Sequence, residues 1–130
     1  MALDADLKTF ATSGNFAALT TLGHDGQPST HMMWVDADDD HLLVNTETHR
    51  VKFKNVERDP RVTVTVVDKD STYRYIEARG RVVEKITGPE AREHIDALSR
   101  RYTGNDYGNP IQSERVILRI AVDRIYKNGV

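Results

Sequence analysis

RVTVTVVDKDSTYRYIEARGRVVEKI, residues 61–86, is the stretch that decides the fold. Within 61–68, valine and threonine alternate residue by residue, which places the valines on one face of a half-buried strand. The DKDS segment at 68–71 is typical of a tight turn, and residues 73–86 read as a long strand. Gly80 lies inside that strand, where a glycine indicates a bulge or a bend of the kind that curves a barrel. The stretch therefore predicts an antiparallel pair within a curved sheet.

Turn and cap signals outside this stretch predict the other elements. Asp25-Gly26 is a hairpin signal between two extended segments, and Asp59-Pro60 ends a short helix that Thr48 or His49 caps. Thr87-Gly88-Pro89-Glu90 fits a capping box with proline just inside the helix. The predicted strands are 16–22, 28–36, 41–47, 61–68, 73–86 and 115–127, and the predicted helices are 4–12, 50–58 and one that follows Thr87. Six strands with three short helices predict a mainly β fold, a small antiparallel barrel that forms one domain over residues 1–130.

The composition excludes several classes of protein. The net charge of −2 argues against general nucleic-acid binding, which normally needs a clearly basic face. The chain has no cysteine, which removes disulfide and thiol chemistry and fits a reducing compartment. No basic segment followed by an apolar run opens the chain, and no run approaches the roughly 20 apolar residues of a membrane helix. We therefore expect a cytoplasmic protein with no membrane and no nucleic-acid partner.

A cluster of cations precedes the strand at 61–68. Residues 50–61 contain five Lys and Arg side chains and two acidic residues, so these twelve positions carry 5 − 2 = +3 against −2 for the whole chain. Cations near the C-terminal end of a helix are favoured by its dipole, which explains the later members as a solvated helix face. The cluster consists of Arg50, Lys52, Lys54, Arg58 and Arg61.

The first two cations of this cluster are harder to explain in that way. Arg50 and Lys52 lie in the first helical turn, where the dipole disfavours positive charge. A bound phosphate or carboxylate reverses the sign, because free N–H groups at a helix start and two cations together form an anion site. Thr46 and Thr48, just before the helix, either cap it or donate hydroxyls to the same ligand. The alternatives for this segment are thus a solvated helix and an anion-binding site.

Two other segments carry side chains that suit a flat ligand. Residues 29–34 place Met32 and Trp34 beside Thr30, which is either a strand with one face in the core or a wall for a planar ring. Tyr73 and Tyr75 share one face of their strand and either pack across it or close a pocket on a neighbouring subunit. The five histidines show no metal-type spacing, and no phosphate loop, nucleophile elbow or dinucleotide fingerprint is present. We therefore predict no metal site, assign no catalytic residue, and expect any chemistry to belong to a cofactor.

The chain resembles the flavin and deazaflavin oxidoreductases of the pyridoxamine 5'-phosphate oxidase-like split-barrel superfamily. The matching segments are AALTTLGHDGQP (17–28), RVKFKNVERDPRVTV (50–64) and EARGRVVE (77–84), of which the run R-x-K-x-x-N-x-x-R-D-P-R is the most specific. The resemblance implies a six-stranded split barrel that forms a homodimer, with two cofactor sites at the subunit interface.

The resemblance also implies roles for individual residues. Arg50 and Lys52 would hold the phosphate-bearing tail of the cofactor, and Tyr73 and Tyr75 would reach in from the partner subunit. The residues expected along the cofactor ring, largely through backbone groups, are Thr30, Met32, Asn45 and Thr46.

The whole-chain pattern looks most like the branch that uses the deazaflavin coenzyme F420. We therefore expect a reductase that passes hydride from this coenzyme to an unsaturated organic small molecule. The alternatives are an FMN-dependent oxidoreductase of the same superfamily and a non-catalytic flavin or deazaflavin carrier.

Overall fold

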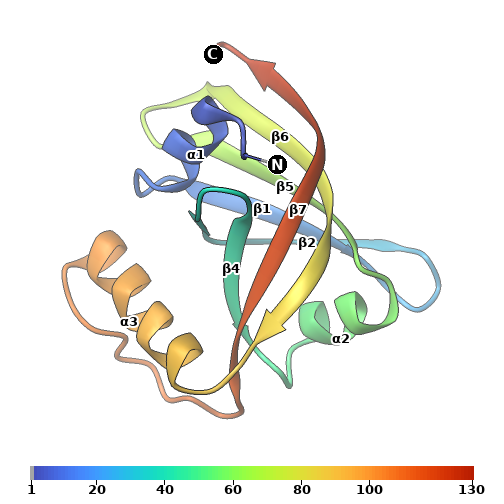
Figure 1. Cartoon of the computed structure of the whole chain (residues 1–130), viewed down its shortest axis with the longest axis vertical. Helices are drawn as coiled ribbons and strands as arrows, with labels where there is room; N and C mark the ends of the chain where they lie inside the picture. Colours follow the sequence, from blue (N-terminus) through green and yellow to red (C-terminus); the bar gives the residue numbers. More distant parts are fainter. Residues whose placement is uncertain (1) are drawn as a thin grey trace.

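Strands β5 (Arg61–Asp68) and β6 (Ser71–Ile86) form the antiparallel pair that the sequence predicts, and the sheet extends on both sides of them. The computed structural model describes residues 2–130 and has the strand order β2-β1-β5-β6-β7-β4-β3, with every neighbouring pair antiparallel. Figure 1 shows this sheet curling on itself, with α1, α2 and α3 at its margins. The mainly β prediction is confirmed. The other elements are α1 (Ala5–Ala11), β1 (Phe16–Leu22), β2 (Pro28–Trp34), β3 (Asp36–Ala37), β4 (Leu42–Glu47), α2 (Val51–Arg58), α3 (Pro89–Thr103) and β7 (Arg115–Asn128).

The sheet has seven strands, so the prediction of six was wrong. The segment 28–36, expected as one strand, divides at Val35 into β2, which pairs with β1, and β3, which pairs with β4. Val35 is fully buried, and its N–H donates to the Tyr102 hydroxyl at 3.2 Å instead of joining either pairing. A tyrosine 67 residues away therefore sets the break, and nothing within the segment signals it.

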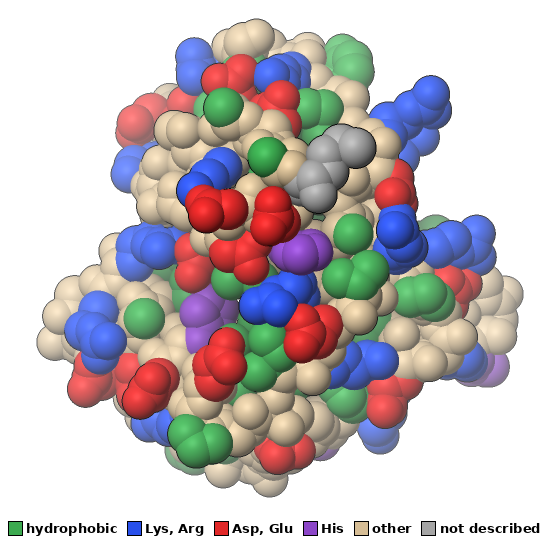
Figure 2. All heavy atoms as spheres, viewed as in Figure 1, with side chains coloured by type: hydrophobic (Ala, Val, Ile, Leu, Met, Phe, Trp, Pro, Cys, Tyr) green, Lys and Arg blue, Asp and Glu red, His purple; other side chains and the backbone are tan. Residues whose placement is uncertain are grey.

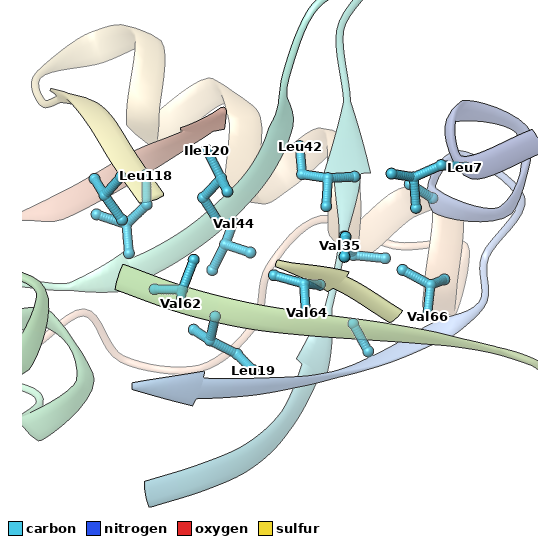
Figure 3. Packing of buried hydrophobic residues seen from close by; sticks show 14 of the residues in the cluster. Leu7, Leu19, Val35, Leu42, Val44, Val62, Val64, Val66, Leu118 and Ile120 are labelled. Carbon is cyan, nitrogen blue, oxygen red and sulfur yellow. The ribbon is translucent and has the colours of Figure 1, made fainter. Parts of the chain in front are cut away.

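The core fills the inside of the curled sheet. Val62, Val64 and Val66 of β5 point into it, as their alternation predicts, and meet side chains of β1, β4 and β7 such as Leu19 and Leu118 (Figure 3). Each fully buried side chain of this kind contributes roughly 1.5–3 kcal/mol relative to leaving it in water. Outside the core, acidic and basic side chains are interspersed over the face shown in Figure 2.

Two predicted helix caps are absent, because each helix begins one or two residues later than expected. The first residue of α3 is Pro89, whose fixed φ suits the first helical position, and the N-cap is Gly88 with no side-chain hydrogen bond, so Thr87 forms no capping box. The N-cap of α2 is Arg50, again without a side-chain cap, while the His49 ring bonds to Ser113 at 2.6 Å. Over residues 2–130, none of the helices combines the length and apolar character that crossing a membrane requires.

Gly80 lies at a bulge, as expected. Arg79 pairs with Arg124 and Gly80 with Val122, so one residue of β7, Asp123, has no partner on β6. A Cβ atom at Gly80 would lie 2.0 Å from the carbonyl oxygen of Ala121, which is far inside van der Waals contact. Only glycine lets the two longest strands approach this closely where the sheet bends.

Replacing Gly80 with alanine should therefore destabilise the fold by about 3 kcal/mol, because an overpacked side chain here meets backbone that cannot move aside. The measurement is the free energy of unfolding in urea. The control is Gly108→Ala, since a Cβ at Gly108 meets nothing within 4 Å. Equal stability of the two variants would contradict the close-approach argument.

Candidate functional site

A groove of about 380 Å³ lies where β2, β4, α3 and the start of α2 come together. Apolar and aromatic side chains make up most of its wall, and polar side chains gather at one part of it. The wall consists of Phe16, Met32, Met33, Trp34, Ile95, Leu98 and Tyr107. The polar group consists of Asn45, Arg50, Lys52, Asn109 and Arg115. The groove thus combines an apolar wall with a concentration of positive charge.

The aromatic part of the wall is held in place by Tyr102. The Trp34 ring stacks on the Tyr102 ring with centroids 5.1 Å apart and planes inclined by 9°, and Phe16 packs on the same ring at 5.4 Å. The Tyr102 hydroxyl donates to the carbonyl oxygen of Asn15 and accepts the N–H of Val35. Because Tyr102 is fixed by these bonds, Trp34 presents an ordered flat surface of the kind that suits a planar π-system.

Positive charge gathers at the first turn of α2. This turn contains no acidic residue, and the N–H groups of Val51 and Lys52 have no hydrogen-bond partner within residues 2–130. Lys52 is half-buried and forms no ion pair with any other described residue. Burial and the neighbouring Arg50 and Arg115 all lower the pKa of Lys52. The ammonium group therefore lacks the counter-charge that a bound anion would supply.

Arg115 contributes a third cation, which the sequence reading missed. Its side chain is almost fully buried, and it directly precedes the apolar residues 116–118. Its Nε donates to Asn45 Oδ1 at 2.9 Å and its Nη1 to Glu47 Oε2 at 3.3 Å, and the guanidinium lies 5.1 Å from the centre of the Tyr107 ring. A basic residue directly before the apolar residues 116–118 is the signal that points to it.

The buried carboxylate of Glu47 joins these elements. It accepts the N–H groups of Gln112 and Ser113 at 2.7 and 2.8 Å and also bonds to Arg50 at 3.1 Å and to Arg115. Burial raises the pKa of Glu47, but these hydrogen bonds and cations outweigh it and hold the pKa below the ordinary value. Three cations against one carboxylate leave 3 − 1 = +2 at this part of the groove, which favours an anionic ligand.

The structure brings together four of the residues expected at the site: Met32, Asn45, Arg50 and Lys52 all line the groove. The other expected residues lie outside its lining. Thr30 is exposed two residues from Met32 and bonds to Thr20 at 2.8 Å.

Thr46 and Thr48 do not present their hydroxyls to the groove. Thr46 is fully buried on the core-facing side of β4, and its hydroxyl has no partner among the described residues. Thr48 follows β4 and donates its N–H to the carbonyl of Glu114 at 3.0 Å.

The two expected tyrosines lie on β6, away from the groove of the same chain. The Tyr73 side chain is 81% exposed. The Tyr75 ring lies 6.4 Å from that of Tyr126 on β7. Any contact between these rings and a groove would have to come from a second copy of the chain.

The last two cations of the sequence cluster have ordinary surroundings. Arg58 bonds to Asn55, and Arg61 forms a two-point ion pair with Asp59, which lowers the pKa of that carboxyl to about 2. Asn55 in turn bonds to Thr21 at 3.0 Å and fastens α2 to β1. The solvated-face interpretation fits the later part of the cluster, whereas Arg50 and Lys52 line the groove.

Known proteins match this chain in sequence pattern and in fold. The family model of pyridoxamine 5'-phosphate oxidase matches residues 3–129. A solved structure of an F420 reductase superposes with a TM-score of 0.79 at 27% sequence identity, over 92% of this chain and 94% of that one. A conserved hypothetical protein of Mycobacterium tuberculosis superposes with a TM-score of 0.76 at 28% identity, over 98% of this chain and 85% of that one.

A third solved structure is alike in fold alone. It is a candidate pyridoxamine 5'-phosphate oxidase from Listeria innocua, with a TM-score of 0.70 at 20% identity over 94% of each chain. Comparison with curated protein sequences gives no significant match.

Glu47→Gln should destabilise the protein by about 3 kcal/mol at pH 7, because it leaves the buried Arg115 and the adjacent Arg50 without their anion. The pKa of Glu47 in the folded protein lies below its ordinary value, so its charge stabilises the fold above about pH 4.3. This contribution is lost as the pH falls through the folded-state pKa. The stability difference between wild type and variant should therefore stay constant from neutral pH to about pH 5 and shrink below about pH 4. Urea unfolding at each pH measures it.

The matched control is Glu57→Gln, which removes an exposed carboxylate from α2. This change should alter stability by less than about 0.5 kcal/mol. If the difference in unfolding free energy between the wild type and Glu47→Gln stayed constant down to pH 3, the ionised carboxylate would not be what stabilises the site.

Proposed function

The chain belongs to the pyridoxamine 5'-phosphate oxidase family of flavin-binding oxidoreductases, and from that premise we propose that it uses the reduced deazaflavin coenzyme F420 to transfer hydride to an unsaturated organic substrate. The observation that carries the proposal is the groove itself, in which an excess of two positive charges adjoins a flat aromatic wall. A phosphate-bearing, planar cofactor has both complementary parts. The F420 reductase that superposes on this chain supports the deazaflavin over FMN.

The residues present fit such a cofactor. Arg50 and Lys52, with the free N–H groups at the start of α2, bind its anionic tail, since a helix start favours negative charge. Met32 and Trp34 contact the ring and exclude water from its surface. When bound, the coenzyme supplies the hydride, and the protein supplies orientation and electrostatics.

We also propose that the active form is a homodimer in which each groove is completed by the partner. The support is the position of Tyr73 and Tyr75, which are remote from the groove of their own chain, and the 81% exposure of Tyr73. An aromatic side chain this exposed is suited to burial against a second copy of the chain.

Fluorescence titrations with coenzyme F420 and with FMN test the choice of cofactor. Tight binding of F420 alone supports the reductase, and the next step is a screen of enones and quinones for turnover. Preferential binding of FMN favours the FMN-dependent alternative. Tight binding of F420 without turnover of any acceptor favours a carrier, and binding of neither cofactor contradicts the proposal.

Replacing both Arg50 and Lys52 with alanine should weaken cofactor binding about 100-fold or more, because each charge-assisted contact is worth roughly 1.5–3 kcal/mol. The dissociation constant from the same titration measures the effect. The control is Arg61→Ala, which removes a cation of the same sequence cluster that Asp59 already pairs. Equal affinities of the double variant and the wild type would show that the cluster does not hold the cofactor.

Tyr73→Ala should weaken cofactor binding if the partner subunit contributes to the groove, since within one chain Tyr73 does not line it. The experiment measures affinity together with the molar mass in solution. An unchanged affinity in a dimeric variant would assign Tyr73 to packing on the sheet surface.

A further inference from the structure

A chain of hydrogen bonds runs from β3, through α3 and β4, to the arginine of the groove. Asp36 Oδ2 lies 3.0 Å from His94 Nε2, and His94 Nδ1 lies 3.0 Å from Asn45 Nδ2. Asn45 Oδ1 accepts Arg115 Nε at 2.9 Å. These four side chains come from four different elements, β3, α3, β4 and β7.

The donors and acceptors along this series of hydrogen bonds fix the direction of each bond. Both hydrogens of the Asn45 amide are used, one on the carbonyl of Ala91 at 3.0 Å and one on His94 Nδ1, which leaves Oδ1 for Arg115. The His94 Nδ1 must therefore present a lone pair. The imidazole hydrogen then lies on Nε2 and is donated to Asp36.

Asp36 is suited to accept that hydrogen. Burial raises the pKa of Asp36, but hydrogen bonds from His94, from the N–H of Ala37 and from Arg101 outweigh it and hold the pKa below the ordinary value. The side chains of His94 and Asp36 are only 11% and 15% exposed, so water does not readily replace either partner. The carboxylate therefore selects one tautomer of His94.

Arg115 is held at two points by this arrangement. Its Nε is bonded to Asn45 and its Nη1 to Glu47, which together fix the plane of the guanidinium. Neither of these two bonds uses Nη2, and Arg115 lines the groove. Release of the Asn45 contact would leave the guanidinium held only by its bond to Glu47 and its contact with the Tyr107 ring.

We propose that Asp36 and His94 are positioning residues that orient the Asn45 amide, and through it Arg115, toward the anionic part of the bound cofactor. The part of this inference that concerns the cofactor rests on the proposed function. Neither Asp36 nor His94 needs to touch the ligand. A purely structural role, in which the pair merely fastens α3 to β3, would not depend on which ring nitrogen carries the hydrogen.

Asp36→Asn separates the two roles. An asparagine whose oxygen accepts Arg101 offers its amide hydrogen to His94 Nε2, and the ring hydrogen then moves to Nδ1. Two donors would then face each other between His94 and Asn45, which displaces the Asn45 amide and weakens its contact with Arg115. The variant preserves shape and volume, reverses the direction of the hydrogen bond to His94 and removes the negative charge that faces Arg101.

The primary measurement is ¹⁵N NMR of the cofactor-free protein, which reports the His94 tautomer and the exchange of the Arg115 Nε–H with water. We expect the Nε2–H tautomer in the wild type and the Nδ1–H tautomer in Asp36→Asn. Exchange at Arg115 should be about 10-fold faster in Asp36→Asn and in His94→Leu, the effect of losing one hydrogen bond of about 1.4 kcal/mol to a charged group. Unchanged exchange in both variants overturns the proposal.

Two further variants serve as controls. His94→Asn places an amide oxygen near the position of Nδ1 and should restore slow exchange at Arg115, which His94→Leu does not. Arg101→Met removes the cation that is paired with Asp36 and should leave the His94 tautomer as it is. Failure of His94→Asn to restore exchange, in a variant whose thermal unfolding is that of the wild type, also overturns the proposal.

Titration with coenzyme F420 and with FMN completes the test. Asp36→Asn and His94→Leu should bind about 10-fold more weakly than the wild type, in line with the loss of one charge-assisted contact. Their effect should vanish when Arg115 is already replaced by methionine. If the variants show faster exchange but unchanged affinity, the positioning role is overturned. If the wild type shows the predicted tautomer and exchange but binds neither cofactor, the proposed function is overturned instead.

Discussion

The buried carboxylate of Glu47 is the interaction on which the site depends. Two backbone N–H groups before β7, Arg50 at the start of α2, and Arg115 all bond to it. A single anion thereby joins β4 to the loop before β7 and brings two of the three groove cations to one place. A buried charge is tolerated only when its hydrogen-bonding capacity is filled, and four donors fill it here.

The alternation of β4 separates the core from the site. Leu42, Val44 and Thr46 face the interior of the curled sheet, while Asn45 and Glu47 face the opposite side, beneath α3 and the loop that follows it. The hydrophobic core and the polar side chains of the groove therefore lie on opposite faces of β4 and do not compete for space. One strand performs both tasks because successive side chains point to opposite faces of a sheet.

The sequence predicted those features that depend on neighbouring residues. The alternation of valine with threonine identified β5 and its buried face, and Gly80 identified the bend, since period-two patterning and a glycine inside a strand are local signals. The helix caps were wrong by one or two residues, because Pro89 at the first helical position displaced the start that Thr87 suggested. The break at Val35 was invisible, since its cause is Tyr102 on α3.

The residues of the candidate site can likewise be divided into those that the sequence indicates and those that only the tertiary structure brings in. Arg50 and Lys52 could be recognised from the sequence by itself, because two cations in the first turn of a helix oppose its dipole, whatever the rest of the chain does. Arg115 lies 65 residues along the chain from Arg50, and nothing in the sequence relates the two. Only the pairing of β4 with β7 brings Arg115 beside Glu47 and Asn45, and only the packing of α3 places His94 against that amide. The sequence thus determined the strands, the bend and the first two cations of the groove. The tertiary structure decided which distant side chains complete the groove, because strand pairing and helix packing set the hydrogen bonds of about 3 Å between elements.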